Sequence, residues 1–176
     1  PFIPCGSGIW GDLKKPGLWD GKMAYPKNVV TEDPFGSGRK VALLQAISPD
    51  LSIVHVPFAD THGNGIILGS MYYDYWLARA GKKIVLIADQ IIDTEMCRRY
   101  PNLVAIPGVG VDAVVPWYMG AWPCNSPGVY GEDLEHISMF IKNSRGEQLR
   151  NYLDKYVYSW ENHQQYLELI GAEKVA

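Results

Sequence analysis

Short apolar runs fill the middle of the chain, and they are bounded by proline, glycine and acidic residues. Most of them lack the alternation of apolar and polar positions that marks a half-exposed strand, which predicts strands buried inside a sheet. The runs expected to form strands are residues 41–46, 51–57, 65–70, 83–89, 103–108 and 111–116.

Helical segments are expected between these strands. Ser70 is a candidate N-cap for a helix over residues 71–80, with Gly81 as its stop signal. A second, short helix is expected around residues 93–100. Strands that alternate with helices in this way predict an α/β layered fold with an open sheet.

The last third of the chain has helical periodicity instead. Leu134, Ile137 and Ile141 fall on one helical face, and such apolar stripes usually face a core. No internal repeat divides the sequence, so one domain is expected over residues 1–176. Its expected parts are a glycine- and aromatic-rich loop region (1–38), an α/β core (39–131) and a helical tail (132–176).

Composition and charge narrow the classes of function. Hydrophobic residues make up 47% of the chain and charged residues 20%, as in ordinary globular proteins. The net charge is −3 and no basic stripe is present, so neither nucleic acid nor a membrane is an expected partner. The three cysteines lie far apart without a CxxC pair, which fits reduced thiols in the cytoplasm and predicts no metal site.

Two glycine-rich stretches resemble nucleotide-binding motifs only superficially. Gly108, Gly110 and Ala113 match the spacing of a dinucleotide fingerprint, but a strand ending at Pro116 is expected after them in place of the required helix. The stretch 33–40 (DPFGSGRK) lacks the spacing of a phosphate-binding loop. A tight turn before a strand is the simpler interpretation of it.

Residues 58–66 (FADTHGNGI) hold the one histidine that has a carboxylate and an amide close by. Asp60 followed by Gly63 and Asn64 is turn chemistry between two strands, and no further cluster with metal-ligand spacing supports a metal site. A structural turn is therefore favoured by composition alone. The other histidines, His55 in a strand and His136 and His163 on helices, are expected to be structural.

Several motifs in order along the chain resemble family I coenzyme A transferases. Ala59-Asp60-x-x-Gly63-Asn64 between two strands resembles the "ADxxGN" signature of that family, and "IPGVGVDAVV" followed by "GAWP" resembles its "IPG…VDAVV…GAHP" segment. The tail and the opening "PFIPCGSGIWGDL" resemble the alpha (A) subunit of glutaconate CoA-transferases. Trp122 stands where "GAHP" has histidine.

This resemblance implies a fold of the NagB/RpiA/CoA-transferase type and a partner beta subunit in a hetero-oligomer, α2β2 or higher. It implies that CoA moves between an acyl-CoA and a free carboxylic acid through a glutamyl-CoA thioester. The glutamate lies on the beta subunit, so no catalytic residue is expected in this chain. No permanently bound cofactor is implied, because the coenzyme A thioester is a substrate.

The resemblance also suggests which residues form the alpha subunit's side of the site. The candidates for substrate binding or oxyanion stabilisation are Ser7, Gly8, Trp10, Gly11, Asp12, Asp60, Gly63 and Asn64. Asp60 and Asn64 are equally expected to pin the turn through hydrogen bonds to the backbone. The candidates for an acyl pocket or a subunit interface are Trp117, Tyr118 and Trp122.

The chain is expected to be the C-terminal portion of a subunit, since the family's N-terminal strand and glycine-rich segment are not found in it.

Two alternatives to the transferase function remain open. An acyl-CoA hydrolase or ring-opening enzyme on the same scaffold is one alternative. A non-catalytic sensor or structural subunit is another, because fold alone does not determine function.

Overall fold

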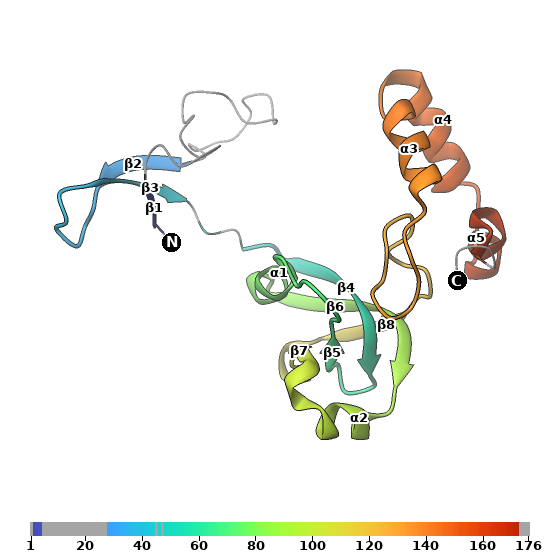
Figure 1. Ribbon diagram of the computed structural model, residues 1–176, viewed down its shortest axis with the longest axis horizontal. Helices are drawn as coiled ribbons and strands as arrows, with labels where there is room; N and C mark the ends of the chain where they lie inside the picture. Colours follow the sequence, from blue (N-terminus) through green and yellow to red (C-terminus); the bar gives the residue numbers. More distant parts are fainter. Residues whose placement is uncertain (1, 5–27, 45, 47, 173–176) are drawn as a thin grey trace. The chain divides into compact units, whose positions relative to one another are not determined.

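The structure of the chain is a computed structural model that describes residues 2–4, 28–44, 46 and 48–172 (Figure 1). The chain divides into two compact units, Pro1–Ile47 and Ser48–Ala176. The expected organisation as one domain with parts meeting near residues 38 and 131 stays a prediction.

The first unit contains a three-stranded antiparallel sheet in the order β1-β3-β2, formed by β1 (Phe2–Pro4), β2 (Asn28–Glu32) and β3 (Lys40–Leu44). The loop between β2 and β3 closes where the Asp33 amide donates to the Arg39 carbonyl oxygen at 2.8 Å. Gly36 in this loop has a φ of 79°. The stretch 33–40 is thus a hairpin turn that leads into a strand, as its sequence predicts.

The second unit is built on a five-stranded sheet in the order β7-β5-β4-β6-β8. The neighbours β4, β6 and β8 are parallel, whereas β5 and β7 are antiparallel to their neighbours. Figure 1 shows β4 and β6 side by side. This mixed sheet with helices confirms the predicted α/β class. The strands are β4 (Leu51–Asp60), β5 (Gly65–Ile66), β6 (Lys83–Ile92), β7 (Val104–Ile106) and β8 (Ala113–Pro116).

The first helix is shorter than its sequence predicts. Helix α1 spans Asp74–Ala80, and its N-cap residue Tyr73 makes no capping hydrogen bond through its side chain. The predicted N-cap at Ser70 is wrong, because Tyr72 has a φ of 40°, which a right-handed helix does not accept. The strand expected over residues 65–70 is likewise cut to two residues.

Helix α2 (Thr94–Arg99) follows β6 as expected. It begins where Oδ1 of Asp93 accepts a hydrogen bond from the Glu95 amide at 2.8 Å, the usual role of an N-cap aspartate. Two 3₁₀ turns, Pro101–Leu103 and Gly108–Gly110, flank β7.

The core of the second unit lies on one face of the sheet, beneath α1. Val54 and Val56 of β4 pair in register with Leu86 and Ala88 of β6, and all four are at most 2% exposed. The opposite face of β4 is open at its start, where Ile53 is 53% exposed. The uniform burial predicted for this strand is therefore wrong, because only one face has a covering layer in this region.

The tail forms three helices, α3 (Leu134–Asn143), α4 (Gly146–Tyr156) and α5 (His163–Ile170). Two positions of the apolar stripe of α3 are not covered by the residues that the structure describes, since Leu134 is 65% and Ile141 66% exposed. Helix α5 does bury its apolar face, and Tyr166 and Ile170 pack in one cluster with Met119. None of the helices in the described ranges is long and apolar enough to cross a lipid bilayer.

The one-sided core generates a stability prediction. Leu86→Ala removes a side chain with no exposed surface and leaves a cavity, so we expect the free energy of unfolding in urea to fall by about 2–5 kcal/mol. Leu51→Ala makes the same chemical change at a position that is 47% exposed, and we expect a loss of less than about 1 kcal/mol there. Equal losses at the two positions would contradict the described packing.

Candidate functional site

The turn after β4 is folded around the carboxylate of Asp60, whose residue has no exposed surface. Oδ1 of Asp60 accepts hydrogen bonds from the backbone amides of His62 and Asn64, each at 2.9 Å. Oδ2 accepts a third from the side-chain amide Nδ2 of Asn64 at 2.7 Å. The Gly63 amide donates to the Asp60 carbonyl oxygen at 3.1 Å, and Gly63 has a φ of 85°. The turn-pinning role expected for Asp60 and Asn64 is therefore present.

These hydrogen bonds keep Asp60 ionised. Burial by itself raises the pKa of this carboxyl group, but the hydrogen bonds from the Asn64 side chain and from the Asn64 and His62 backbone outweigh it. The net effect holds the pKa of Asp60 below its ordinary value of 3.8. Folding and ionisation of the turn are thus linked.

Gly108 packs directly against this turn. The Gly108 amide donates to Oδ1 of Asn64 at 3.0 Å, and a Cβ at Gly108 would lie 2.1 Å from the His62 carbonyl oxygen. After the 3₁₀ turn Gly108–Gly110 the chain runs into β8, which ends at Pro116. The strand that the sequence predicts after these glycines is therefore present, and it ends at Pro116 as expected.

His62 lies between two open cavities beside this turn. Its Nδ1 is 3.0 Å from Oγ1 of Thr94, at the start of α2. The β8 cavity, of about 440 Å³, is lined by Thr61, His62, Gly63, Ile91, Val111, Asp112, Ala113, Val114 and Pro116. The α2 cavity, of about 430 Å³, is lined by His62, Asn64, Thr94, Cys97, Arg98, Pro101, Val104 and Pro107.

The position of these cavities fits a ligand site. Asp60 and Ile92 pair at the carboxyl ends of the parallel strands β4 and β6, and the turn follows directly. In open α/β sheets, ligands characteristically bind at the carboxyl ends of the strands. Within the described part of the chain, no group of three or more His, Cys, Asp or Glu side chains is placed to hold a metal ion.

The residues predicted from the sequence fall into three groups. Asp60, Gly63 and Asn64 come together in the turn, where Gly63 lines one cavity and Asn64 the other. The predicted oxyanion role of these residues stays a prediction, and the backbone amides of residues 62–64 already donate within the turn. The candidates of the opening loop, which lie outside the described residues, are Ser7, Gly8, Trp10, Gly11 and Asp12.

The predicted acyl-pocket or interface residues pack against other parts of the second unit. The ring of Trp117 lies 4.3 Å from that of His163 in α5, and the ring of Trp122 lies 4.0 Å from that of His136 in α3. Tyr118 meets Tyr130 edge to face at 5.9 Å. None of the three predicted residues lines the two cavities described above. Their role in an acyl pocket or an interface stays a prediction.

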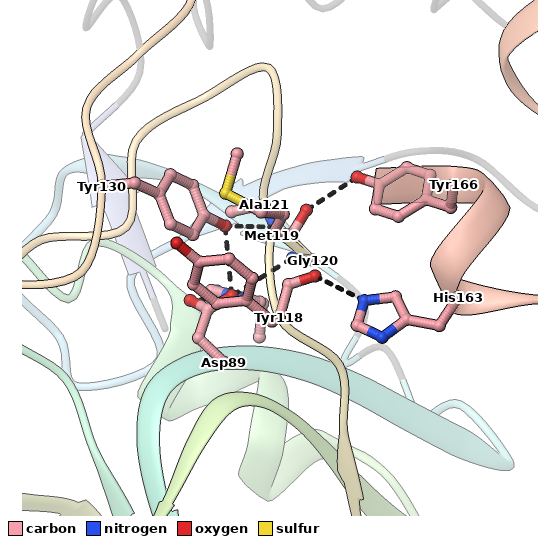
Figure 2. A network of polar contacts seen from close by, with 9 residues as sticks. Asp89, Tyr118, Met119, Gly120, Ala121, Tyr130, His163 and Tyr166 are labelled. Carbon is pink, nitrogen blue, oxygen red and sulfur yellow. Dashed lines mark hydrogen bonds and ion pairs between the residues drawn. The ribbon is translucent and has the colours of Figure 1, made fainter. Parts of the chain in front are cut away.

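A second buried carboxylate, Asp89 of β6, was missed by the sequence analysis (Figure 2). Its side chain has no exposed surface, and Oδ2 lies 3.0 Å from Nε2 of His55 on the neighbouring strand β4. Oδ1 accepts hydrogen bonds from the Gly120 amide at 3.2 Å and from the Tyr130 hydroxyl at 3.3 Å. Burial favours a raised pKa for Asp89, but its interactions with His55, with the Ser126 side chain and with the Gly120 amide leave the pKa below its ordinary value.

The loop held by Asp89 in turn holds the tail, as Figure 2 shows. The Tyr166 hydroxyl donates to the Met119 carbonyl oxygen at 2.7 Å, and Nε2 of His163 donates to the Tyr118 carbonyl oxygen at 2.9 Å. His55 and His163 thus belong to a polar network that connects β4, β6, this loop and α5. The purely structural role expected for them stays a prediction. One signal in the sequence could have indicated this network, namely the aspartate, Asp89, that ends the apolar run of residues 83–89 (KIVLIAD).

Comparisons with known proteins identify relatives of this chain, although no protein-family model matches it. The A subunit of glutaconate CoA-transferase from Acidaminococcus fermentans is 31% identical over 99% of this chain and 57% of its own length. An uncharacterised protein of Archaeoglobus fulgidus is 39% identical over 82% of this chain and 32% of its own length. The chain thus spans somewhat more than half of the Acidaminococcus subunit and about a third of the Archaeoglobus protein.

Solved structures agree with this relationship. The crystal structure of glutaconate coenzyme A-transferase from Acidaminococcus fermentans matches with a TM-score of 0.77 and 31% identity, over 85% of this chain and 47% of that one. The sheet and the turn of the second unit therefore belong to the α/β fold of the CoA-transferases. More particularly, the chain is a homologue of the A subunit of glutaconate CoA-transferase, as the motifs in its sequence predict.

More distant relatives carry other activities in their names. The cholesterol ring-cleaving hydrolase IpdA subunit of Rhodococcus jostii is 25% identical over 84% of this chain and 50% of its own length. The decarboxylase AibA/AibB has a structure that matches with a TM-score of 0.57 and 25% identity, over 88% of this chain and 54% of that one. The same scaffold therefore occurs in proteins named for three different reactions.

The pinned turn predicts an acid-dependent loss of stability. Because the folded-state pKa of Asp60 is below 3.8, its ionised form stabilises the fold fully above that pH, and this contribution is lost as the pH falls through the folded-state pKa. We expect Asp60→Asn to lower the free energy of unfolding at pH 7 by about 1–3 kcal/mol, and the deficit to shrink in strong acid. Urea titrations across this pH range measure it. Asp154→Asn, at an exposed position of α4, is the matched control and should change little.

The close contact at Gly108 predicts a contrast between neighbouring glycines. A methyl group at Gly108 meets the His62 carbonyl oxygen, whereas at Gly110 it meets only Cδ1 of Ile84 at an ordinary 3.6 Å. We expect Gly108→Ala to destabilise the protein by more than about 1 kcal/mol, measured by thermal unfolding, and Gly110→Ala to be nearly neutral. Two neutral substitutions would refute the described packing of the turn.

Proposed function

We propose that the chain is the alpha subunit of a CoA-transferase that moves CoA between an acyl-CoA and a free carboxylic acid. The observation that carries this proposal is the relationship to the glutaconate CoA-transferase homologue over 99% of the chain. The position of the His62 turn at the carboxyl ends of β4 and β6 supports it, because substrates of open α/β sheets bind there.

In the proposed reaction a glutamate carboxylate, supplied by a partner beta subunit, attacks the thioester carbonyl carbon and expels the CoA thiolate. The mixed anhydride formed in this way is attacked by that thiolate at the glutamyl carbonyl, which releases the first acid and leaves a glutamyl-CoA thioester. The incoming carboxylate repeats the sequence in reverse. Dividing one transfer into such covalent steps lowers each barrier and gives ping-pong kinetics.

This chain would supply the wall of the site rather than the nucleophile. Asp60, Gly63 and Asn64 hold the turn through hydrogen bonds, so they act as positioning residues. The side chains of Thr61 and His62 line the β8 cavity and are the polar groups of the turn that a bound substrate would meet there. A rigid turn that fixes them would favour a defined substrate position.

A second candidate is an acyl-CoA hydrolase or ring-opening enzyme. The 25% identity to a ring-cleaving hydrolase subunit favours it specifically. Water in place of the second carboxylic acid would suffice for hydrolysis of a covalent acyl intermediate. A non-catalytic sensor or structural subunit is the remaining alternative.

Isotope exchange distinguishes these functions. The protein in its natural assembly is incubated with a panel of acyl-CoAs and isotope-labelled acetate, and the label is followed into the thioester pool. We expect labelled acetyl-CoA to form. Loss of thioester without exchange would indicate the hydrolase, and no reaction with any acyl-CoA would contradict both enzymatic functions.

A pair of variants ties the activity to the His62 turn. Ile91 lines the β8 cavity and is 42% exposed, so Ile91→Trp fills the cavity without disturbing a buried core. We expect it to lower kcat/KM by at least about tenfold, as loss of substrate positioning does. Ile53→Trp makes the same change at a strand position that is 53% exposed and does not line the cavity, and it should have a small effect.

A further inference from the structure

The side chains that line the β8 cavity are mostly aliphatic. Five of its lining side chains are aliphatic, and they come from the end of β6 and from the segment that contains β8. They are those of Ile91, Val111, Ala113, Val114 and Pro116. Its volume of about 440 Å³ is within the range of small-ligand sites. A cavity with this lining favours the hydrocarbon part of a ligand.

Within the described part of the chain, the lining contains no cation that could pair with an anionic ligand. Asp112 lines it, and hydrogen bonding to the Ile84 amide at 2.8 Å holds the pKa of Asp112 below its ordinary value. Lys83 is the cation near this carboxylate, and its Nζ lies 3.4 Å from Oδ1 of Asp112, so its charge is already matched. Among the described residues that line the cavity, none is a lysine or an arginine.

Two further lining residues, Thr61 and His62, can form hydrogen bonds with a ligand such as the thioester carbonyl group. Nδ1 of His62 is already engaged with Thr94. Arg98 lines the separate α2 cavity and pairs with Glu95 one helical turn away, so it does not serve the β8 cavity.

We propose that the β8 cavity binds the acyl group of the CoA substrate and selects uncharged aliphatic acyl groups over those with a second, distal carboxylate. A distal carboxylate would lose water against aliphatic side chains and would find no lysine or arginine in the described lining to pair with, and both effects weaken binding. An uncharged chain of the same length meets neither penalty. This inference rests on the proposed transferase or hydrolase function.

A matched pair of thioesters tests the proposal. Pentanoyl-CoA and glutaryl-CoA have acyl chains of five carbons each and differ by a terminal methyl group against a terminal carboxylate. With the protein in its natural assembly and labelled acetate as acceptor, we expect kcat/KM for total thioester consumption to be at least about tenfold higher for pentanoyl-CoA. Equal or better use of glutaryl-CoA would overturn the selectivity while leaving the proposed function intact.

A charge-reversal variant locates the selectivity in this cavity. Ile91→Lys places an ammonium group in the lining, and we expect it to lower the ratio of pentanoyl-CoA to glutaryl-CoA use by at least about fivefold. Ile53→Lys adds the same charge on the same sheet outside the cavity and should leave the ratio unchanged. Equal shifts in both variants would refute the site, because they would reflect net charge alone. If neither thioester reacts with the wild-type protein, the proposed function fails, and the inference falls with it.

Discussion

The carboxylate of Asp60 is the group on which the arrangement of the candidate site depends. It lies fully buried at the end of β4 and organises two backbone amides and the Asn64 side chain around itself. Oδ1 of Asn64 also accepts a hydrogen bond from the Gly108 amide, and this bond holds the β7–β8 connection against the turn. A buried charge is tolerated only when its hydrogen-bonding capacity is met, so this carboxylate specifies one geometry for everything that surrounds it.

A second buried carboxylate organises the backbone around it in the same way. Asp89 on β6 has a fully buried side chain, as Asp60 has, and holds the loop of residues 117–130 through Gly120 and Tyr130. The carbonyl groups of that loop then accept hydrogen bonds from Tyr166 and His163 of α5. Two ionised carboxylates on adjacent parallel strands thus fix, respectively, the turn beside the cavities and the loop that carries the tail. Burial of the apolar core beneath α1 stabilises the fold without favouring one orientation, whereas the hydrogen bonds to the carboxylates fix the orientation of the loops.

The relationship to a named CoA-transferase gives this geometry a chemical context. A turn whose amides are already engaged is well suited to hold side chains in place, and less suited to donate new hydrogen bonds to a reacting oxygen. The arrangement is compatible with the proposed function, in which this chain forms part of the substrate site and a partner supplies the nucleophile. The acyl selectivity that we propose depends on the mainly aliphatic lining of the β8 cavity beside the turn.

The sequence by itself determined the α/β class, the positions of β4, β6 and α2, the hairpin loop at residues 33–40 and the kinship with CoA-transferases. These depend on local patterns, namely apolar runs, turn residues and caps, which act over a few positions. It also located the turn at Asp60, whose residue types are those of turns in general. It failed at Tyr72, where a positive φ shortens the helix, and at Leu134 and Ile141, where periodicity predicts a partner surface without showing whether the chain contains it.

Only the tertiary structure decided which polar groups meet. His55 and Asp89 are 34 positions apart in the sequence and come together because β4 and β6 pair in one parallel register. Asn64 reaches Gly108 for the same kind of reason, across 44 positions. The cavities beside His62 arise from separate segments of the chain. No local pattern encodes such meetings, since they follow from strand order and register, which the whole sheet sets at once.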